Sequence, residues 1–102
     1  MKRTELQWIF SRMVADLLDK AHELGYEVTL GDCYRDPRCP YGNSSSLHKK
    51  RLAIDLNLFK DGEYLRSGED HRILGEWWKS IGGSWDVRDG NHYSLNDGTM
   101  VY

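Results

Sequence analysis

Hydrophobic residues recur at intervals of three and four over the first part of the chain, between Thr4 and Leu24. They form two adjacent stripes, as on one side of an α-helix. The first stripe comprises Leu6, Ile9, Met13 and Leu17, and the second comprises Phe10, Val14, Leu18 and Ala21. Gly25 follows as a helix stop, because glycine readily adopts the left-handed conformation that ends many helices. The pattern predicts an amphipathic helix over 4–24.

Strict alternation of apolar and polar residues indicates two strands further along. The first covers Tyr26 to Leu30, and the second covers Leu52 to Phe59. In the second, one face carries Leu52, Ile54, Leu56 and Leu58, and the other carries Ala53, Asp55 and Asn57. Asp55 is therefore predicted to project away from the core. Asp61-Gly62 is a tight-turn signal that leads into a short strand over 63–65.

The last third of the chain predicts a second helix and two short strands. Ser67 followed by Asp70 is a helix start, and Gly82-Gly83 ends the helix. Its predicted buried face comprises Ile73, Leu74, Trp77, Trp78 and Ile81. The strands are expected around Trp85, another predicted core residue, and over 91–95. In the latter, His92 and Ser94 share one face, opposite Tyr93 and Leu95. Without repeats or a linker, these elements predict one α+β domain over 1–102, with a small antiparallel sheet and flanking helices.

Composition narrows the functional classes. The chain has 102 residues, 39% of them hydrophobic, and a net charge of -2, which suits one modest core and does not suggest a nucleic-acid binder. The basic run 48–51 is a candidate phosphate-binding patch, but it has only three cations and no interleaved aromatic residue. No apolar run has the length of a signal peptide or a membrane span. We therefore expect a monomer made in the cytoplasm, without stable membrane insertion.

A long irregular loop is predicted over 31–47, and such loops are usually functional or mobile. It contains the two cysteines of the chain, Cys33 and Cys39. Reduced thiols are the first interpretation, and a disulfide formed after release into an oxidising space is the second. A metal site built on this pair is the least expected, because no second pair completes it.

Two histidines and two aspartates form the main candidate for chemistry. His48 lies seven residues before Asp55, and Asp89 lies three residues before His92. Two imidazoles and one carboxylate are a common ligand set for catalytic zinc, with a fourth position open for water. The spacing alone is weak evidence, because a histidine is more often a surface or hydrogen-bonded residue than a ligand. His22 and His71 are interpreted in that way, as ordinary surface residues of the two helices.

At these residues the chain resembles a known family. Ser46-x-His48-x6-Asp55, with Ala53 two residues before the aspartate, resembles the first motif of zinc D-Ala-D-Ala carboxypeptidases and of the L-alanyl-D-glutamate endopeptidases of phage lysins. Asp89-x-x-His92 resembles their second motif. The preceding Gly82-Gly83-Ser84-Trp85 is similar to a Gly-Gly-x-Trp of the endopeptidase branch, and Tyr34-Arg35 is similar to a Tyr-Arg pair of the family.

The resemblance implies a function and a set of roles. His48, Asp55 and His92 would bind Zn²⁺ on the open face of the sheet, and Asp89 would be the catalytic acid/base. Arg35 and Ser46 would lie in the substrate cleft, although a surface ion pair and a loop cap are simpler roles for them.

The substrate expected from the resemblance is a peptidoglycan stem peptide, and L-alanyl-D-glutamate endopeptidase activity is preferred because the short chain has little material for lids. D-Ala-D-Ala carboxypeptidase activity and a non-enzymatic, zinc-stabilised domain are the alternatives. With no signal peptide, an endolysin would reach the cell wall through a separate permeabilising protein.

Overall fold

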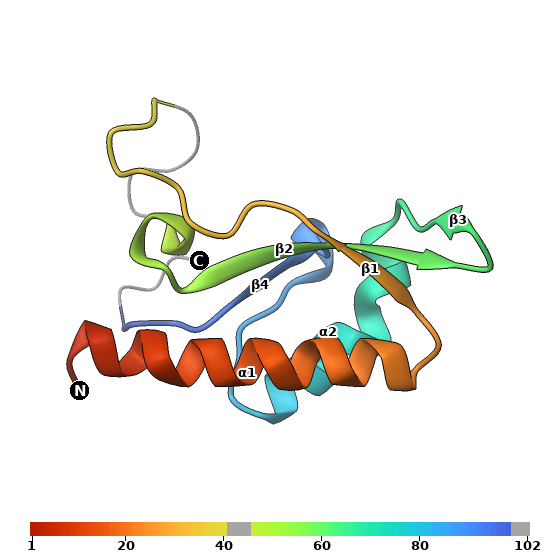
Figure 1. Ribbon diagram of the computed structural model, residues 1–102, viewed down its shortest axis with the longest axis horizontal. Helices are drawn as coiled ribbons and strands as arrows, with labels where there is room; N and C mark the ends of the chain where they lie inside the picture. The colour runs from red at the N-terminus through yellow and green to blue at the C-terminus, as the bar shows by residue number, and fades with distance from the viewer. Residues whose placement is uncertain (41–45, 99–102) are drawn as a thin grey trace.

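The computed structural model describes residues 1–40 and 46–98, and it has the predicted α+β architecture with a small antiparallel sheet and two helices (Figure 1). Residues 41–45 of the predicted long loop lie outside the described residues. The helices and strands are α1 (Arg3–Glu23), β1 (Glu27–Leu30), β2 (Ala53–Lys60), β3 (Glu63–Tyr64), α2 (Arg72–Ser80) and β4 (His92–Ser94). Three 3₁₀ turns complete the order, η1 (Leu47–Lys50), η2 (Gly68–His71) and η3 (Val87–Asp89).

The first helix has clear signals at both ends. The Glu5 carboxylate accepts a hydrogen bond from the backbone N–H of Lys2, which satisfies one of the free donors at the start of α1. At the other end, Gly25 has a φ of 91°, and the N–H of Tyr26 returns to the carbonyl of Ala21. The chain therefore reverses at Gly25 and enters β1 alongside the helix that it has just left.

β2 is the central strand and pairs antiparallel with each of the other three strands. Leu56 is opposite Leu30 of β1, and Asp55 is opposite His92 of β4. The predicted Asp61-Gly62 turn joins β2 to β3 with positive φ at both residues, as in a type I′ hairpin. Because every partner strand pairs with β2, the registers of all three pairs are defined relative to this one strand.

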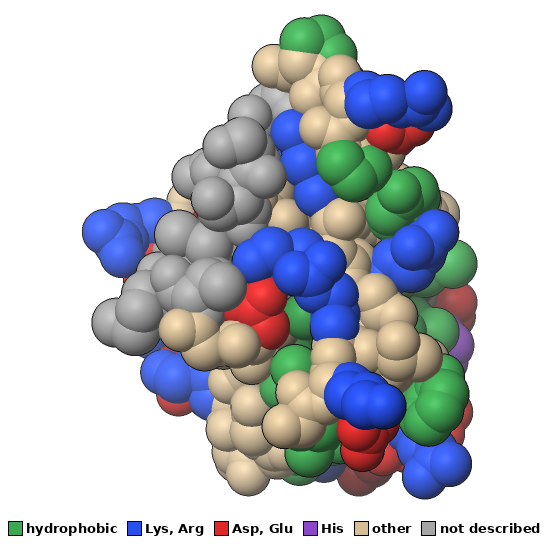
Figure 2. All heavy atoms as spheres, turned by 90° about the vertical axis from the view of Figure 1, so that its left-hand side faces the viewer, with side chains coloured by type: hydrophobic (Ala, Val, Ile, Leu, Met, Phe, Trp, Pro, Cys, Tyr) green, Lys and Arg blue, Asp and Glu red, His purple; other side chains and the backbone are tan. Residues whose placement is uncertain are grey.

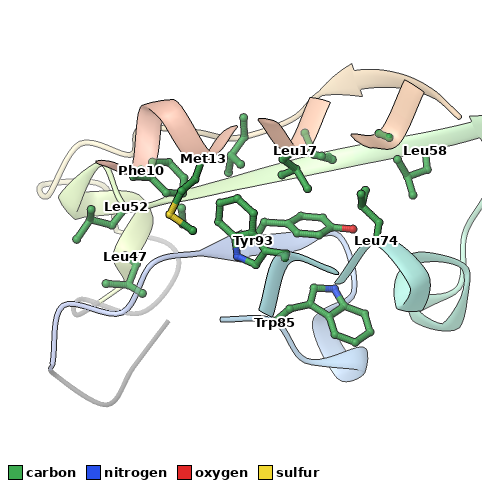
Figure 3. Packing of buried hydrophobic residues seen from close by; sticks show 14 of the residues in the cluster. Phe10, Met13, Leu17, Leu47, Leu52, Leu58, Leu74, Trp85 and Tyr93 are labelled. Atoms are coloured by element: carbon green, nitrogen blue, oxygen red, sulfur yellow. The ribbon is translucent and has the colours of Figure 1, made fainter. Parts of the chain in front are cut away.

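The core lies between the helices and one face of the sheet. Figure 3 shows α1 residues Phe10, Met13 and Leu17 packed above Tyr93, with Leu74 beside it. The predicted inward positions of β2 are buried, namely Leu52, Ile54, Leu56 and Leu58. Trp78 is fully buried and packs edge-on against both Phe10 and Tyr93, and Trp85 is buried against Gly75. The prediction that Trp78 and Trp85 belong to the core is confirmed.

The predicted buried face of the second helix is wrong at two positions. Ile73 is 65% exposed and Ile81 is 39% exposed. The segment begins as the 3₁₀ turn η2, and the side of α2 that faces the core follows the spacing His71, Leu74, Gly75 and Trp78. Successive residues of a helix are rotated by about 100°, so Ile73 lies off the side that carries Leu74 and Trp78 and points away from the core.

His71 is not the surface residue that the sequence suggested. Its side chain is buried, and its Nδ1 lies 2.8 Å from the hydroxyl oxygen of Tyr93. Burial lowers the pKa of His71 to about 4, in spite of the nearby negative charge of Asp70. The imidazole is therefore neutral at pH 7 and forms part of the core boundary.

Smaller departures occur at the strands. The strand expected around Trp85 is reduced to a single bridge between Ser84 and Ser94. Leu30, the last residue of β1, is 63% exposed. Among the described residues, no helix combines the length and the apolar character that crossing a membrane requires.

Candidate metal centre

The pairing of β2 with β4 brings Asp55 and His92 together. The two residues are direct partners in the register, and their neighbours Ile54 and Tyr93 are also partners. Ile54 and Tyr93 point into the core, and side chains alternate along a strand. Asp55 and His92 consequently share the opposite face of the sheet, where His92 Nδ1 lies 3.4 Å from Asp55 Oδ1.

His48 reaches the same point from the turn η1, just before β2. The Ser46 side chain accepts a hydrogen bond from the N–H of His48 at 3.2 Å and caps the turn. Arg51 ends the turn with a left-handed φ of 58°, and the N–H of Leu52 returns to the carbonyl of Leu47. This compact turn holds His48 against the start of the strand that carries Asp55.

The three predicted ligands converge. His48 Nε2 lies 3.1 Å from Asp55 Oδ1 and 3.1 Å from His92 Nδ1, and one candidate ligand atom from each residue lies within 4.8 Å of the others. In a tetrahedral site with bonds of roughly 2.0–2.1 Å, ligand atoms lie about 3.3 Å apart. The spacing and the chemistry of this donor set therefore fit a zinc ion.

A second contact orients His48. Its Nδ1 lies 3.0 Å from the backbone carbonyl of Cys33 and donates its proton there. This leaves the lone pair of Nε2 directed at Asp55 and His92, the arrangement that a metal-binding histidine needs. The sequence analysis did not identify this role, because a carbonyl carries no residue signature.

The loop after β1 also fixes the backbone of Asp55. The N–H of Asp55 donates to the carbonyl of Asp32, and the N–H of Gly31 donates to the carbonyl of Asp55, both at 2.8 Å. A Cβ on Gly31 would lie 3.1 Å from the Cβ and the carbonyl oxygen of Asp55. Asp55 is thus enclosed between the extension of β1 and the strand β4, and only glycine leaves full room at position 31.

The electrostatics of the group favour ionised Asp55. Burial of Asp55 tends to raise its pKa, but the hydrogen bonds to His48 and His92 outweigh this and hold the pKa at about 2. For His48, burial favours the neutral ring, whereas the hydrogen bonds to Asp55 and to the Cys33 carbonyl give a net rise in pKa. The carboxylate is therefore charged over the whole physiological pH range and is available as an anionic ligand.

Asp89 lies at the rim of the ligand group. It ends the short turn η3, which Asp86 caps by accepting the N–H of Arg88. One carboxylate oxygen of Asp89 lies 4.0 Å from His92 Nδ1, and 56% of the side chain is exposed. The three ligand residues are much more buried than Asp89, so Asp89 is the most solvent-exposed of the four side chains.

The two residues expected in the substrate cleft have different surroundings. The backbone N–H of Arg35 donates to the carbonyl of His48, and its guanidinium lies 3.2 Å from Asp32. The Arg35 side chain is only 13% exposed. Ser46 is 4% exposed and caps η1. Both residues therefore contact the segment that holds His48, and Ser46 occupies the structural role that was its simpler interpretation.

The two cysteines are free thiols, and the cations of the basic run contact other residues of the chain. Cys33 is an exposed free thiol and Cys39 a partly buried one. Lys49 is buried and donates to the carbonyl of Cys39, Lys50 pairs with Asp97 at 2.9 Å, and Arg51 stacks on Tyr34. Figure 2 shows Lys and Arg side chains over the face where α1 begins, with hydrophobic side chains among them. All three cations of the run have contacts within the chain.

Comparison with known proteins assigns neither a family nor a function to the chain. No protein-family model matches the chain, and no curated protein matches it. The geometry of His48, Asp55 and His92 is therefore the main indication of function.

Proposed function

We propose that the protein is a zinc-dependent peptidase that hydrolyses peptidoglycan stem peptides, with the L-alanyl–D-glutamate bond as its target. The observation that carries the proposal is the convergence of His48, Asp55 and His92 beside the exposed carboxylate of Asp89. A purely structural zinc site usually has four protein ligands, whereas a catalytic site keeps one position open. Three ligands and a neighbouring exposed carboxylate correspond to the catalytic arrangement.

The ligand residues prepare the site for a metal. His48 presents Nε2 because its Nδ1 is held by the carbonyl of Cys33, and Asp55 contributes a permanent negative charge. His48, Asp55 and His92 would hold a zinc ion, which would supply Lewis-acid catalysis for hydrolysis of the peptide bond.

Asp89 is proposed to move the proton. Its exposed carboxylate can accept a proton from the attacking water and then donate it to the nitrogen of the leaving amine. The 4.0 Å between Asp89 and His92 puts the carboxylate near the ligands while leaving it outside the group that would bind the ion.

Arg35 and Ser46 are proposed to support the cleft. The guanidinium of Arg35 keeps a small exposed surface while it contacts Asp32, so it can hold a polar substrate group at the edge of the site. Ser46 acts as a positioning residue, because its hydroxyl holds the N–H of His48. In this proposal the protein works on the cell wall.

Mass spectrometry of digested peptidoglycan tests the proposal. Purified sacculi are incubated with the zinc-loaded protein, with a chelated sample as the control. New L-Ala carboxyl ends on the glycan and soluble peptides that begin with D-Glu are expected. Release of only a terminal D-Ala would instead assign D-Ala-D-Ala carboxypeptidase activity. No metal-dependent product from several wall types would leave a non-enzymatic, zinc-stabilised domain.

A further inference from the structure

A polar cavity of about 250 Å³ lies next to the candidate metal centre. It is formed by the segment that follows β3 and the segment that leads to β4. The lining residues that matter for its chemistry are Arg66, His71, Asp89 and Asn91. Because Asp89 also lies 4.0 Å from His92, this carboxylate is common to the cavity and to the rim of the ligand group.

The cavity has a firmly built base. η2 and η3 approach so closely that a Cβ on Gly90 would lie 2.4 Å from the Cα of Gly68. The indole N–H of Trp85 donates to the carbonyl of Gly90 at 2.7 Å, which ties this base to the core. The spacing of the two segments is thus set by backbone packing rather than by side chains that can move aside.

Among the cationic side chains of the cavity, Arg66 differs from Arg88 in its ion pairing. Arg88 is paired with Asp86 at 2.7 Å, and Arg35, near the ligands, is paired with Asp32. Arg66 is exposed and has no ion pair with any residue in the ranges 1–40 and 46–98. Its guanidinium can therefore bind a carboxylate with two parallel hydrogen bonds.

His71 adds a neutral donor to the same cavity. Its imidazole is uncharged at pH 7, since burial lowers its pKa to about 4. The buried hydroxyl of Tyr93 has His71 Nδ1 as its partner at 2.8 Å, and a buried O–H requires an acceptor. Tyr93 accordingly donates to Nδ1, and the ring proton of His71 resides on Nε2, where it can be donated to a ligand.

We propose that this cavity is a subsite for a carboxylate on the amine side of the cleaved bond, an inference that rests on the proposed function. Asp89 returns the proton to the leaving nitrogen, and an α-carboxylate lies two bonds from that nitrogen. Arg66 and His71 would bind the carboxylate while Asp89 faces the amine. A D-glutamate that continues the stem through its side-chain carboxyl has this free α-carboxylate.

Paired substrates test the subsite. One synthetic stem peptide carries the free α-carboxylate on glutamate, and the other carries a carboxamide at that position. Both are cleaved by the zinc-loaded wild type, by Arg66→Gln and by Arg12→Gln, a control at an exposed arginine of α1. We expect the wild type to prefer the carboxylate by about tenfold or more in kcat/KM, mainly through KM. Arg66→Gln should lose this preference, and Arg12→Gln should retain it.

A binding measurement separates failure of the subsite from failure of the proposed function. The leaving-side peptide that begins with D-Glu is titrated by calorimetry into the wild type and Arg66→Gln, again as carboxylate and carboxamide. A wild-type preference that Arg66→Gln loses supports the subsite even if neither peptide is hydrolysed. Equal binding of the two forms by the wild type, or an unchanged preference in Arg66→Gln, overturns it.

Discussion

Asp55 and His92 are direct partners across the β2–β4 pair, and their side chains meet with 3.4 Å between Oδ1 and Nδ1. The register of the sheet therefore fixes the distance between two of the three candidate ligands. Only His48 has to be placed by other means, and the cap from Ser46 and the carbonyl of Cys33 place it.

We expect one zinc ion per chain, bound through this group. Replacing Asp55 with asparagine removes the anionic ligand, so Asp55→Asn should lower zinc affinity by more than about a hundredfold, since loss of an outer partner alone costs roughly 10–100-fold. Competition with a chromophoric chelator measures the affinity. His22→Gln, at an exposed histidine of α1, is the control. Wild-type affinity in Asp55→Asn would contradict the ligand assignment.

Gly31 should affect the zinc affinity of the same site indirectly, through the position of Asp55. Its φ lies outside the left-handed region, so alanine can adopt the backbone, but the new methyl group would lie 3.1 Å from Asp55. Gly31→Ala should displace Asp55 by a few tenths of an ångström and reduce zinc affinity by about tenfold. It should also destabilise the fold by about 1 kcal/mol. Thr29→Ala, on the exposed part of β1, is the matched control, and equal zinc affinities in the two variants would refute this role.

Asp89→Ala should leave zinc binding intact while it reduces hydrolysis. The carboxylate lies outside the ligand group, so the variant should bind zinc as the wild type does. Loss of a general acid/base should reduce kcat by about 10²–10⁴-fold. Zinc content and hydrolysis of a stem peptide are measured on the same preparation. If hydrolysis persists at the wild-type rate, another group transfers the proton.

The burial of His71 predicts a loss of stability in acid. Its pKa is about 4 in the fold and near 6.5 in the unfolded chain. Between these values the unfolded chain binds more protons, so the free energy of unfolding falls as the pH is lowered from about 6.5 to 4. The contribution is on the order of 2 kcal/mol after allowance for solvent screening.

Denaturant unfolding of the metal-free protein at pH 7 and pH 4.5 checks this expectation. The wild type should lose more stability than His71→Gln over that interval, because glutamine does not titrate. His22→Gln should follow the wild type. Identical losses in the wild type and His71→Gln would show that His71 is not the group responsible.

Sequence periodicity predicted the elements well where one helix or strand face is buried. α1 and β2 agree with their predicted ranges to within one residue at each end, because Leu17 and Leu56 belong to long, regular patterns. α2 was less predictable, since η2 precedes it and changes which side meets the core. The spacing of His71 with Leu74 and Trp78 was the signal that could have shown His71 to be buried.

The ligand residues could be named from their motifs, and the structure brings those three together; zinc binding and peptidase activity stay predictions. Contacts made by the backbone could not be foreseen. The carbonyl of Cys33 and the close approach of Gly31 depend on how the loop after β1 lies against Asp55. The cavity beside Asp89 likewise depends on Gly68 meeting Gly90, two residues that no helix or strand pattern links.

β4 is only three residues long, yet it places Tyr93 in the core and His92 in the ligand group. During synthesis, β2 and η1 emerge well before this strand, and they carry His48 and Asp55 alone. The complete set of three ligands first exists when residues 92–94 add to the edge of β2. Completion of the candidate metal centre and closing of the hydrophobic core therefore depend on the same three residues.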